Sequence, residues 1–238
     1  SKEIRVQMEL ASTGVTRYGL PKDEIGRASL PIPDIKTQKL ISGYIEKETK
    51  EIDKLIKAKE IQLQLLSEKR KSLLTQVVTK GINANVKFKD SGINWLGMIP
   101  IHWDLKRLKY ITSKIGSGVT PKGGATVYTK EGIPLLRSQN IHFSGLKLDD
   151  VVFISEEIHE SMENSKVFEG DVLINITGAS IGRCFYYNGE LGEANVNQHV
   201  CILRPNQMVK TEYLYLLLSS NIGQNQVWLN QVGGGREG

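Results

Sequence analysis

Residues 34–80 read DIKTQKLISGYIEKETKEIDKLIKAKEIQLQLLSEKRKSLLTQVVTK, and this stretch decides the fold. It contains no proline and a single glycine, Gly43, so it favours one uninterrupted helix. Asp34, which follows a Pro-Ile-Pro run, suits the N-cap, and Gly81 suits the residue at which a helix ends. At about 1.5 Å per residue the predicted helix would be about 70 Å long, which exceeds the diameter of a small domain.

Apolar side chains recur along this predicted helix at a spacing close to 3.5 residues. That spacing is typical of a coiled-coil seam, and one compact neighbour is too short to cover a stripe of this length. Glu48, Lys59 and Lys69 interrupt the seam, which favours an irregular antiparallel coiled coil over a parallel zipper. The partner helix can belong to the same chain or to a second copy, so a homodimer through this helix is one expectation. The predicted seam residues are Ile41, Ile45, Ile52, Leu55, Leu66 and Leu73.

The chain beyond Gly81 follows a different pattern. A polar, extended stretch runs to Pro100, and short apolar runs separated by Gly, Asn and Asp follow it. We therefore predict an α+β fold, with a strand-rich domain attached to a long antiparallel coiled-coil helix. Strands are predicted at 151–154, 172–174, 184–187 and 199–203, and helices at 212–218 and 223–229.

The composition is that of a globular chain with a core of its own. Of the 238 residues, 39% are hydrophobic and 24% are charged. No apolar run approaches the ~18–20 residues of a membrane span and no secretory leader opens the sequence, so we expect no membrane partner. Cys184 and Cys201 are too few for a disulfide framework or a four-cysteine zinc site, which favours a reduced, cytoplasmic location.

The formal charge of +5 is unevenly distributed along the chain. Residues 34–80 carry 11 Lys or Arg against 7 Asp or Glu, whereas residues 81–238 carry 15 of each. Within the second part, residues 105–137 contain seven bases and one acid, and residues 149–171 contain eight acids and one base. This distribution predicts a positive face toward nucleic acid and an acidic segment that faces away from it. Two unrelated solvated faces are the alternative.

Motifs of the common catalytic sites are missing from the sequence. The glycine-rich stretch 116–124 lacks the Gly-Lys-Ser/Thr order of a nucleotide-binding loop. The four histidines are far apart and show no metal-binding spacing, so no metal site is predicted. Asp171 and Glu193 are a weak basis for a nuclease, because no basic residue at a suitable spacing completes the set. Binding is therefore favoured over catalysis, and we expect no enzyme activity.

Three short loops carry residue types that hold or read DNA. Residues 137–140 and 195–199 are rich in Arg, Gln or Asn, which bind guanine and adenine edges in the major groove. Residues 177–183 form a glycine-rich loop that ends in a base, and backbone N–H groups of such loops contact phosphates. The alternative is that each loop hydrogen-bonds to itself. The candidate DNA-binding residues are Lys106, Lys114, Thr120, Lys122, Arg137, Ser138, Gln139, Asn140, Thr177, Ser180, Arg183, Asn197 and Gln198; among them Arg137, Gln139, Asn140, Asn197 and Gln198 are the candidates for base edges.

The two ends of the chain resemble each other at an offset of 219 residues. Residues 220–238 match residues 1–19 at six identical positions out of 19. A repeat of this kind predicts that the two ends are the same element of two successive units.

Several motifs together resemble the specificity (S) subunits of type I restriction-modification enzymes. Residues 90–104, DSGINWLGMIPIHWD, followed by Arg-Leu-Lys at 107–109, resemble the start of a target recognition domain in that family. Residues 31–41 and 67–81 resemble the start and the end of its long helix. Residues 170–174 and 177–182 resemble a strand and a glycine turn of the domain, so the resemblance covers essentially the whole chain.

The resemblance implies a DNA-recognition subunit without catalytic activity. In this family two recognition domains, separated by two antiparallel helices, each read one half of a bipartite site on double-stranded DNA. Methyltransferase (M) and restriction (R) subunits dock on the S subunit, and S-adenosylmethionine, ATP and Mg belong to those partners rather than to this chain. The implied domains are a recognition-domain tail at 1–33, the spacer helix at 34–80, and a recognition domain at 81–238 that begins with a linker at 81–104.

This organisation also accounts for the 219-residue repeat, and it leads us to expect a piece of a longer subunit or a half-subunit. We expect residues 1–33 to dock as the closing element of a recognition domain. Two other classes stay open: a coiled-coil adaptor whose globular domain binds protein, and a nuclease or methyltransferase in its own right.

Overall fold

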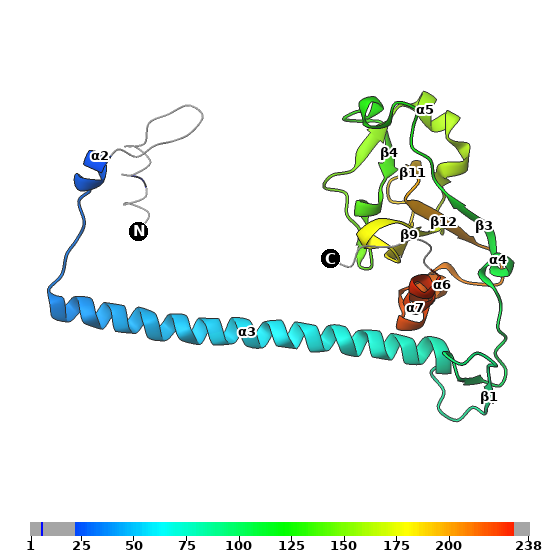
Figure 1. Cartoon of the computed structure of the whole chain (residues 1–238), viewed down its shortest axis with the longest axis horizontal. Helices are drawn as coiled ribbons and strands as arrows, with labels where there is room; N and C mark the ends of the chain where they lie inside the picture. The colour runs from blue at the N-terminus through cyan, green and yellow to red at the C-terminus, as the bar shows by residue number, and fades with distance from the viewer. Residues whose placement is uncertain (1–5, 7–21, 231–238) are drawn as a thin grey trace. The chain divides into compact units, whose positions relative to one another are not determined.

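The computed structural model describes residue 6 and residues 22–230 (Figure 1). The chain divides into two compact units, Ser1–Gln64 and Leu65–Gly238, which we describe one at a time. Most of the predicted tail at 1–33 and both ends of the 219-residue repeat lie outside the described residues, so the expectations about them stay predictions.

The first unit consists of α2, Lys22–Gly26, and most of α3, Ile35–Lys80. Asp34 caps α3, since its Oδ1 accepts a hydrogen bond from the backbone N–H of Thr37 at 3.0 Å and its Oδ2 accepts one from the Thr37 hydroxyl at 2.7 Å. These hydrogen bonds hold the pKa of the Asp34 carboxyl below its ordinary value. The predicted helix is confirmed to within one residue at its start.

The stripe predicted as a coiled-coil seam is exposed on α3. Its six residues, from Ile41 to Leu73, are between 47% and 59% exposed. Exposed apolar side chains at this spacing keep the helix suited to pairing, which stays a prediction.

The second unit contains two four-stranded sheets. The first is antiparallel throughout, in the order β10-β9-β12-β3. The second has the order β7-β4-β11-β8, and in it β11 runs parallel to β4. The strands of the two sheets are β3, Thr112–Ser117; β4, Ile133–Leu136; β7, Val152–Ile154; β8, Lys166–Val167; β9, Val172–Asn175; β10, Cys184–Tyr186; β11, Ala194–Val196; and β12, Val200–Pro205.

Two hairpins and four shorter helices complete this unit. The predicted linker at 81–104 forms the hairpin β1–β2, and a second hairpin, β5–β6, follows β4. Their bounds are β1, Phe88–Asp90; β2, Met98–Pro100; β5, Ile141–His142; and β6, Gly145–Leu146. The helices are α4, Leu108–Ile111; α5, Glu156–Ser161; α6, Thr211–Ser219; and α7, Asn221–Leu229.

The core of the second unit lies in layers. One cluster joins the facing sides of the two sheets, as in the contact of Leu136 and Val196 with Leu173 and Ile202. The other side of the first sheet packs on Leu214 and Leu218 of α6, which Figure 1 shows beside β9 and β12. The other side of the second sheet packs against α5. Each sheet is thus covered on both faces, and its loops are left for other contacts.

The last turns of α3 belong to this unit and hold the helix on α6 and α7. The Tyr213 hydroxyl donates to the Val78 carbonyl at 3.5 Å, and the Asn221 N–H donates to the Thr75 hydroxyl at 3.2 Å. The α+β class and the predicted strands and helices are therefore confirmed, with shifts at the ends of several elements. No helix among the described residues is long and apolar enough to cross a membrane.

Candidate nucleic-acid interface

Four loops meet at one end of the two sheets, because the strands that carry them end side by side. In the first sheet, Cys201 pairs with Ser117 at the end of β3, and Val200 pairs with Asn175 at the end of β9. In the second sheet, Val196 pairs with Leu136, so β11 and β4 end together. We call the meeting point of loops 118–123, 137–140, 176–183 and 197–199 the loop end.

Close backbone approaches fix these loops. A Cβ atom on Gly118 would lie 1.9 Å from the Val196 carbonyl oxygen, so only glycine fits where the loop after β3 crosses β11. Gly182, at φ +83°, packs against Gln224 of α7, whose side-chain Nε2 donates to the Gly182 carbonyl at 2.8 Å. The loop end is therefore a rigid part of the domain rather than a set of free loops.

A hollow of about 350 Å³ lies between the loops. We call it the loop-end hollow; it is lined by Ser138, Gln139, Thr177, Gly178, Ala179, Ser180, Arg183 and His199. Five of these residues, from loops 137–140 and 176–183, belong to the predicted DNA-binding set, and His199 adds a third loop to the lining. Among the residues that the structure describes, no ion pair or hydrogen bond engages the Arg183 guanidinium, so its five donors remain available.

A chain of side-chain hydrogen bonds connects three of the loops. The Thr120 hydroxyl bonds the Gln198 carbonyl oxygen. Nε2 of Gln198 lies 3.0 Å from Nε2 of His199, and Nδ1 of His199 lies 2.5 Å from the Thr177 hydroxyl. We call this chain the Thr120–Thr177 relay. His199 belongs to the loop 195–199 that was predicted to face DNA, but it was not among the candidate DNA-binding residues.

The structure corrects the base-edge prediction for two asparagines. Asn140 is fully buried: its Nδ2 donates to the Lys147 carbonyl at 2.8 Å and to Asp150 Oδ1 at 2.9 Å, while its Oδ1 accepts from the Arg137 N–H. Asn197 is 7% exposed, and its Oδ1 accepts from the His199 N–H at 3.1 Å. Both amides stabilise turns, and their burial leaves them little surface for contact with a base.

Arg137 is also held by its own loop. Its guanidinium donates to the Asp150 carbonyl at 2.6 Å and lies 3.9 Å from the Asp150 carboxylate. The same carboxylate accepts from the Gln139 amide, which is exposed at the edge of the loop-end hollow. Asp150 thus contradicts the expectation that the whole acidic segment 149–171 faces away from this surface.

The predicted DNA face divides in two along β3. Thr120 and Lys122 follow its final residue and are exposed at the loop end. Lys106 precedes α4 at the opposite end of the strand. Lys114, within the edge strand β3, pairs with Arg204 of β12 and donates to the Asn164 carbonyl at 2.8 Å, and burial lowers its pKa. Lys106 and Lys114 therefore lie away from the loop end, and their contact with DNA stays a prediction.

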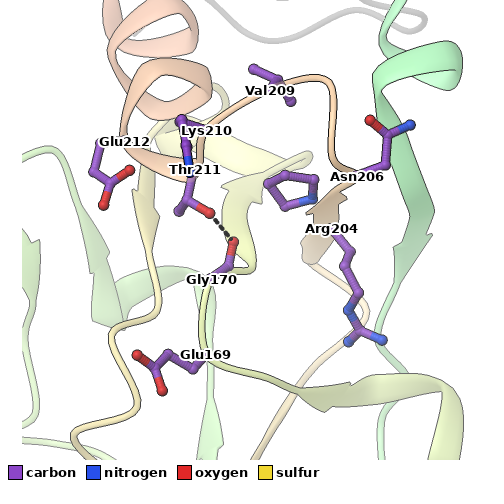
Figure 2. Close-up of a pocket in the computed structure, with 9 residues that line it drawn as sticks. Glu169, Gly170, Arg204, Asn206, Val209, Lys210, Thr211 and Glu212 are labelled. Atoms are coloured by element: carbon purple, nitrogen blue, oxygen red, sulfur yellow. Dashed lines mark hydrogen bonds between the residues drawn. The ribbon is translucent and has the colours of Figure 1, made fainter.

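A second hollow, of about 360 Å³, lies at the other end of β12 (Figure 2). Arg204 donates to both carboxylate oxygens of Asp171, at 2.7 and 2.8 Å, and its guanidinium lies 4.2 Å from the centre of the Phe168 ring. The hydrogen bond with Asp171 raises the pKa of Arg204. The Thr211 hydroxyl donates to the Gly170 carbonyl at 2.9 Å, as Figure 2 shows. We call this the Arg204 hollow, and its central groups bond to each other.

The described residues contain no group of three or more side chains placed to hold a metal ion. Layered sheets with a polar loop end, attached to a long helix with an exposed apolar stripe, define a binding and assembly module. A sequence profile of the type I restriction modification DNA specificity domain matches residues 100–236, and the chain belongs to this family.

Relatives with known roles support the assignment. The chain is 28% identical over 228 residues to the EcoBI type I restriction enzyme specificity subunit of Escherichia coli, which covers 92% of this chain and 47% of that protein. It is 25% identical over 181 residues to the MjaVIII specificity subunit of Methanocaldococcus jannaschii, which covers 76% of this chain and 40% of the relative. The chain thus spans about half the length of these relatives, or less. The resemblance seen in the sequence is confirmed.

A solved structure from work on complex assembly and conformational transition of the type I R-M system has the same fold. It superposes on 92% of this chain and 50% of its own with a TM-score of 0.58 at 19% sequence identity. The shared fold includes the strand-rich domain and the long helix.

Proposed function

We propose that the domain at 81–230 reads one half of a bipartite site on double-stranded DNA through its loop end. The chain acts as a non-catalytic specificity element, and α3 is the spacer that sets the distance to a second recognition domain. M and R subunits dock on it and bring S-adenosylmethionine, ATP and Mg, so the chain itself uses no cofactor. We expect such an assembly to be located in the cytoplasm, where the DNA is.

The loop-end hollow is the observation that carries this proposal. Its walls come from three loops that are tied to the domain by hydrogen bonds, yet the Arg183 guanidinium has no partner among the described residues. DNA recognition needs this combination, because rigid donors and acceptors discriminate between bases while flexible ones adapt to any sequence.

The charged groups and the amide groups at the loop end are assigned different contacts with DNA. Lys122 and Arg183 are the groups for phosphate contacts, which position a protein on the duplex. Gln139 and Gln198 are exposed amides and replace the buried Asn140 and Asn197 as the candidates for base edges.

Selection from a random duplex pool tests the proposal. We expect the full chain to enrich one short sequence and to protect it in footprinting. Equal retention of all duplexes, or binding to protein partners alone, would instead support the adaptor. Co-purification with a methyltransferase subunit tests the docking role separately.

A pair of lysine variants tests which face meets DNA. Lys122→Ala should weaken binding to cognate and scrambled duplexes equally and reduce the salt slope by about one contact. Lys106→Ala, the matched control, removes the same charge at the opposite end of β3 and should leave the slope unchanged. The reverse result would move the DNA face to the other end of the domain.

The exposed seam of α3 supports pairing with a second long helix in antiparallel orientation. In a solution of this chain alone, a second copy supplies that helix and makes a two-fold dimer, which would protect a palindromic site. Ile52→Lys with Leu55→Lys should convert the dimer to a monomer in analytical ultracentrifugation. A wild-type mass that stays monomeric at all concentrations would contradict the dimer.

A further inference from the structure

The Thr120–Thr177 relay has a direction. With the Gln198 amide as placed, the Thr120 hydroxyl donates to its Oε1 and its Nε2 faces Nε2 of His199, so that the amide donates to the ring and Nδ1 of His199 donates to the Thr177 oxygen. This arrangement places the ring proton of His199 on Nδ1, because a ring nitrogen that accepts a hydrogen bond carries no proton. The Thr177 oxygen accepts, so its own proton is free for an acceptor in the loop-end hollow.

One reversed arrangement also satisfies every group. With the His199 proton on Nε2, the Gln198 amide would turn over, its nitrogen would donate to Thr120, and Thr177 would donate its proton to Nδ1. When the His199 ring carries a single proton, reversing one of these hydrogen bonds reverses all three, because one ring nitrogen must donate and the other must accept. The orientation of the exposed Gln198 amide is thus tied to the proton of His199 and to the state of the Thr177 hydroxyl.

We propose that His199 is a positioning residue that fixes the Gln198 amide, and that Gln198 so fixed selects an adenine edge. This inference rests on the proposed function and names the base chemistry that the same surface accepts. An acceptor held by the Thr177 proton in the loop-end hollow, such as a DNA phosphate oxygen, keeps the relay in the observed direction. Phosphate contact and base reading are coupled through the His199 ring.

The remaining hydrogen-bonding groups of Gln198 support adenine. After the relay bonds, Oε1 keeps one lone pair and Nε2 keeps one N–H. Adenine offers the N6 donor and the N7 acceptor side by side in the major groove, which matches one acceptor and one donor. Guanine offers two acceptors there, so the Gln198 carbonyl oxygen would have no donor to face. A reversed amide would exchange the two groups and lose the match in the same register.

Two variants separate the hydroxyl from the shape of Thr177. Thr177→Val keeps the size of the side chain but removes the hydroxyl, so the last bond of the relay is lost. Thr177→Ser keeps the hydroxyl and should restore the relay. This pair distinguishes a positioning role from a packing role, because packing follows the methyl group and positioning follows the oxygen.

The experiment measures binding of the full chain to duplexes that carry each of the four bases at every position of the selected half-site. We expect wild type to prefer adenine about tenfold at one position, and Gln198→Leu to abolish the preference at that position alone. His199→Phe and Thr177→Val should reduce the same preference several-fold, while Thr177→Ser keeps it. Gln207→Leu makes the same amide substitution in the loop before α6 and should change nothing.

Three results would overturn the inference while the proposed function stands. They are an unchanged adenine preference in His199→Phe, identical behaviour of Thr177→Ser and Thr177→Val, and selection at the loop end that does not depend on Gln198. Absence of any duplex selection by wild type would overturn the proposed function as well. Nitrogen-15 NMR of the folded wild-type protein gives a check that needs no variant: a proton on Nδ1 of His199 is expected, and one on Nε2 alone would contradict the relay.

Discussion

The two hollows lie at opposite ends of β12 and differ in how their polar groups are used. Both have a volume near 350 Å³ and both contain an arginine. Arg204 donates twice to Asp171 and stacks on Phe168, whereas Arg183 has no such partner among the described residues. A polar hollow is a better candidate binding site when its arginine is unpaired, and a structural clamp when that arginine is bonded to a buried carboxylate.

The charges that line the two hollows support the same contrast. Glu169 and Glu212 line the Arg204 hollow. Its lining contains two cations: Arg204, which is paired with Asp171, and Lys210. The lining of the loop-end hollow contains Arg183 and no carboxylate. A DNA phosphate is therefore repelled at one end of β12 and attracted at the other. Substitutions at the two ends should affect different properties, folding stability at one and DNA binding at the other.

The largest effect is expected from Asp171→Ala. Asp171 is 1% exposed and accepts from Arg204 and from the Phe168 N–H, so its removal leaves buried donors without an acceptor. We expect the free energy of unfolding to fall by about 2–4 kcal/mol, below the top of the usual range because Arg204 is partly exposed. Urea denaturation measures this. Asp171→Asn, which keeps one acceptor oxygen, should lose less, and equal losses would show that the carboxylate charge has no part.

A smaller effect, on DNA binding rather than on stability, is expected from Arg183→Ala. Loss of one charged phosphate donor should weaken binding about tenfold, which is about 1.4 kcal/mol. Lys210→Ala removes one positive charge from the Arg204 hollow and serves as the matched control. Titration of the selected duplex with each variant measures the two losses of affinity. Equal weakening by the two variants would mean that net charge acts, and not the loop-end hollow.

The long-range pattern of the chain could be predicted from the sequence because it depends on periodicity. The 47 residues from Asp34 to Lys80 contain no proline and carry an apolar stripe, so they favour one long helix, and α3 is that helix. Strands with short continuous apolar runs, such as β9 and β12, were also predicted. β3, β4 and β11 were missed, since β3 is half polar, β4 contains Pro134, and β11 has a central asparagine.

The roles of single side chains in the candidate site could not be predicted in the same way. Asn140 and Gln139 are neighbours with the same amide group, yet one is fully buried and the other exposed. Burial depends on contacts across the fold, such as the bond of Asn140 to Asp150, which no local pattern reports. The three loops were predicted from their residue types to share one surface, and the structure brings them together. That Lys114 and Lys122 lie in different parts of the domain is known only from the strand pairing of β3.

A third prediction concerns Arg137, which the sequence placed at a base edge. Because its guanidinium holds the Asp150 carbonyl at 2.6 Å, Arg137→Ala should lower the free energy of unfolding by about 1 kcal/mol. It should weaken binding to cognate and scrambled duplexes by the same small factor. A change of base preference at one position would restore the original assignment.

The smallest effect is expected at the thiols, which lie on the sheet between the two hollows. Burial raises the pKa of Cys184 to about 12 and also raises that of Cys201, so both thiols are neutral at pH 8 and the reactive thiolate is scarce. Labelling with an aromatic disulfide reagent at that pH should be slow in the native protein and complete, at two thiols per chain, in denaturant.

The rate of this slow labelling reports how often the sheet opens, because a buried thiol reacts from the open form. Arg183→Ala removes a guanidinium that has no partner among the described residues, and it should label at the wild-type rate. Asp171→Ala, at the end whose bonds hold β9 to β12, should label faster in proportion to its lost stability. Equal rates for the two variants would show that the hollows do not differ in their contribution to folding, and the contrast between a binding end and a structural end would then be wrong.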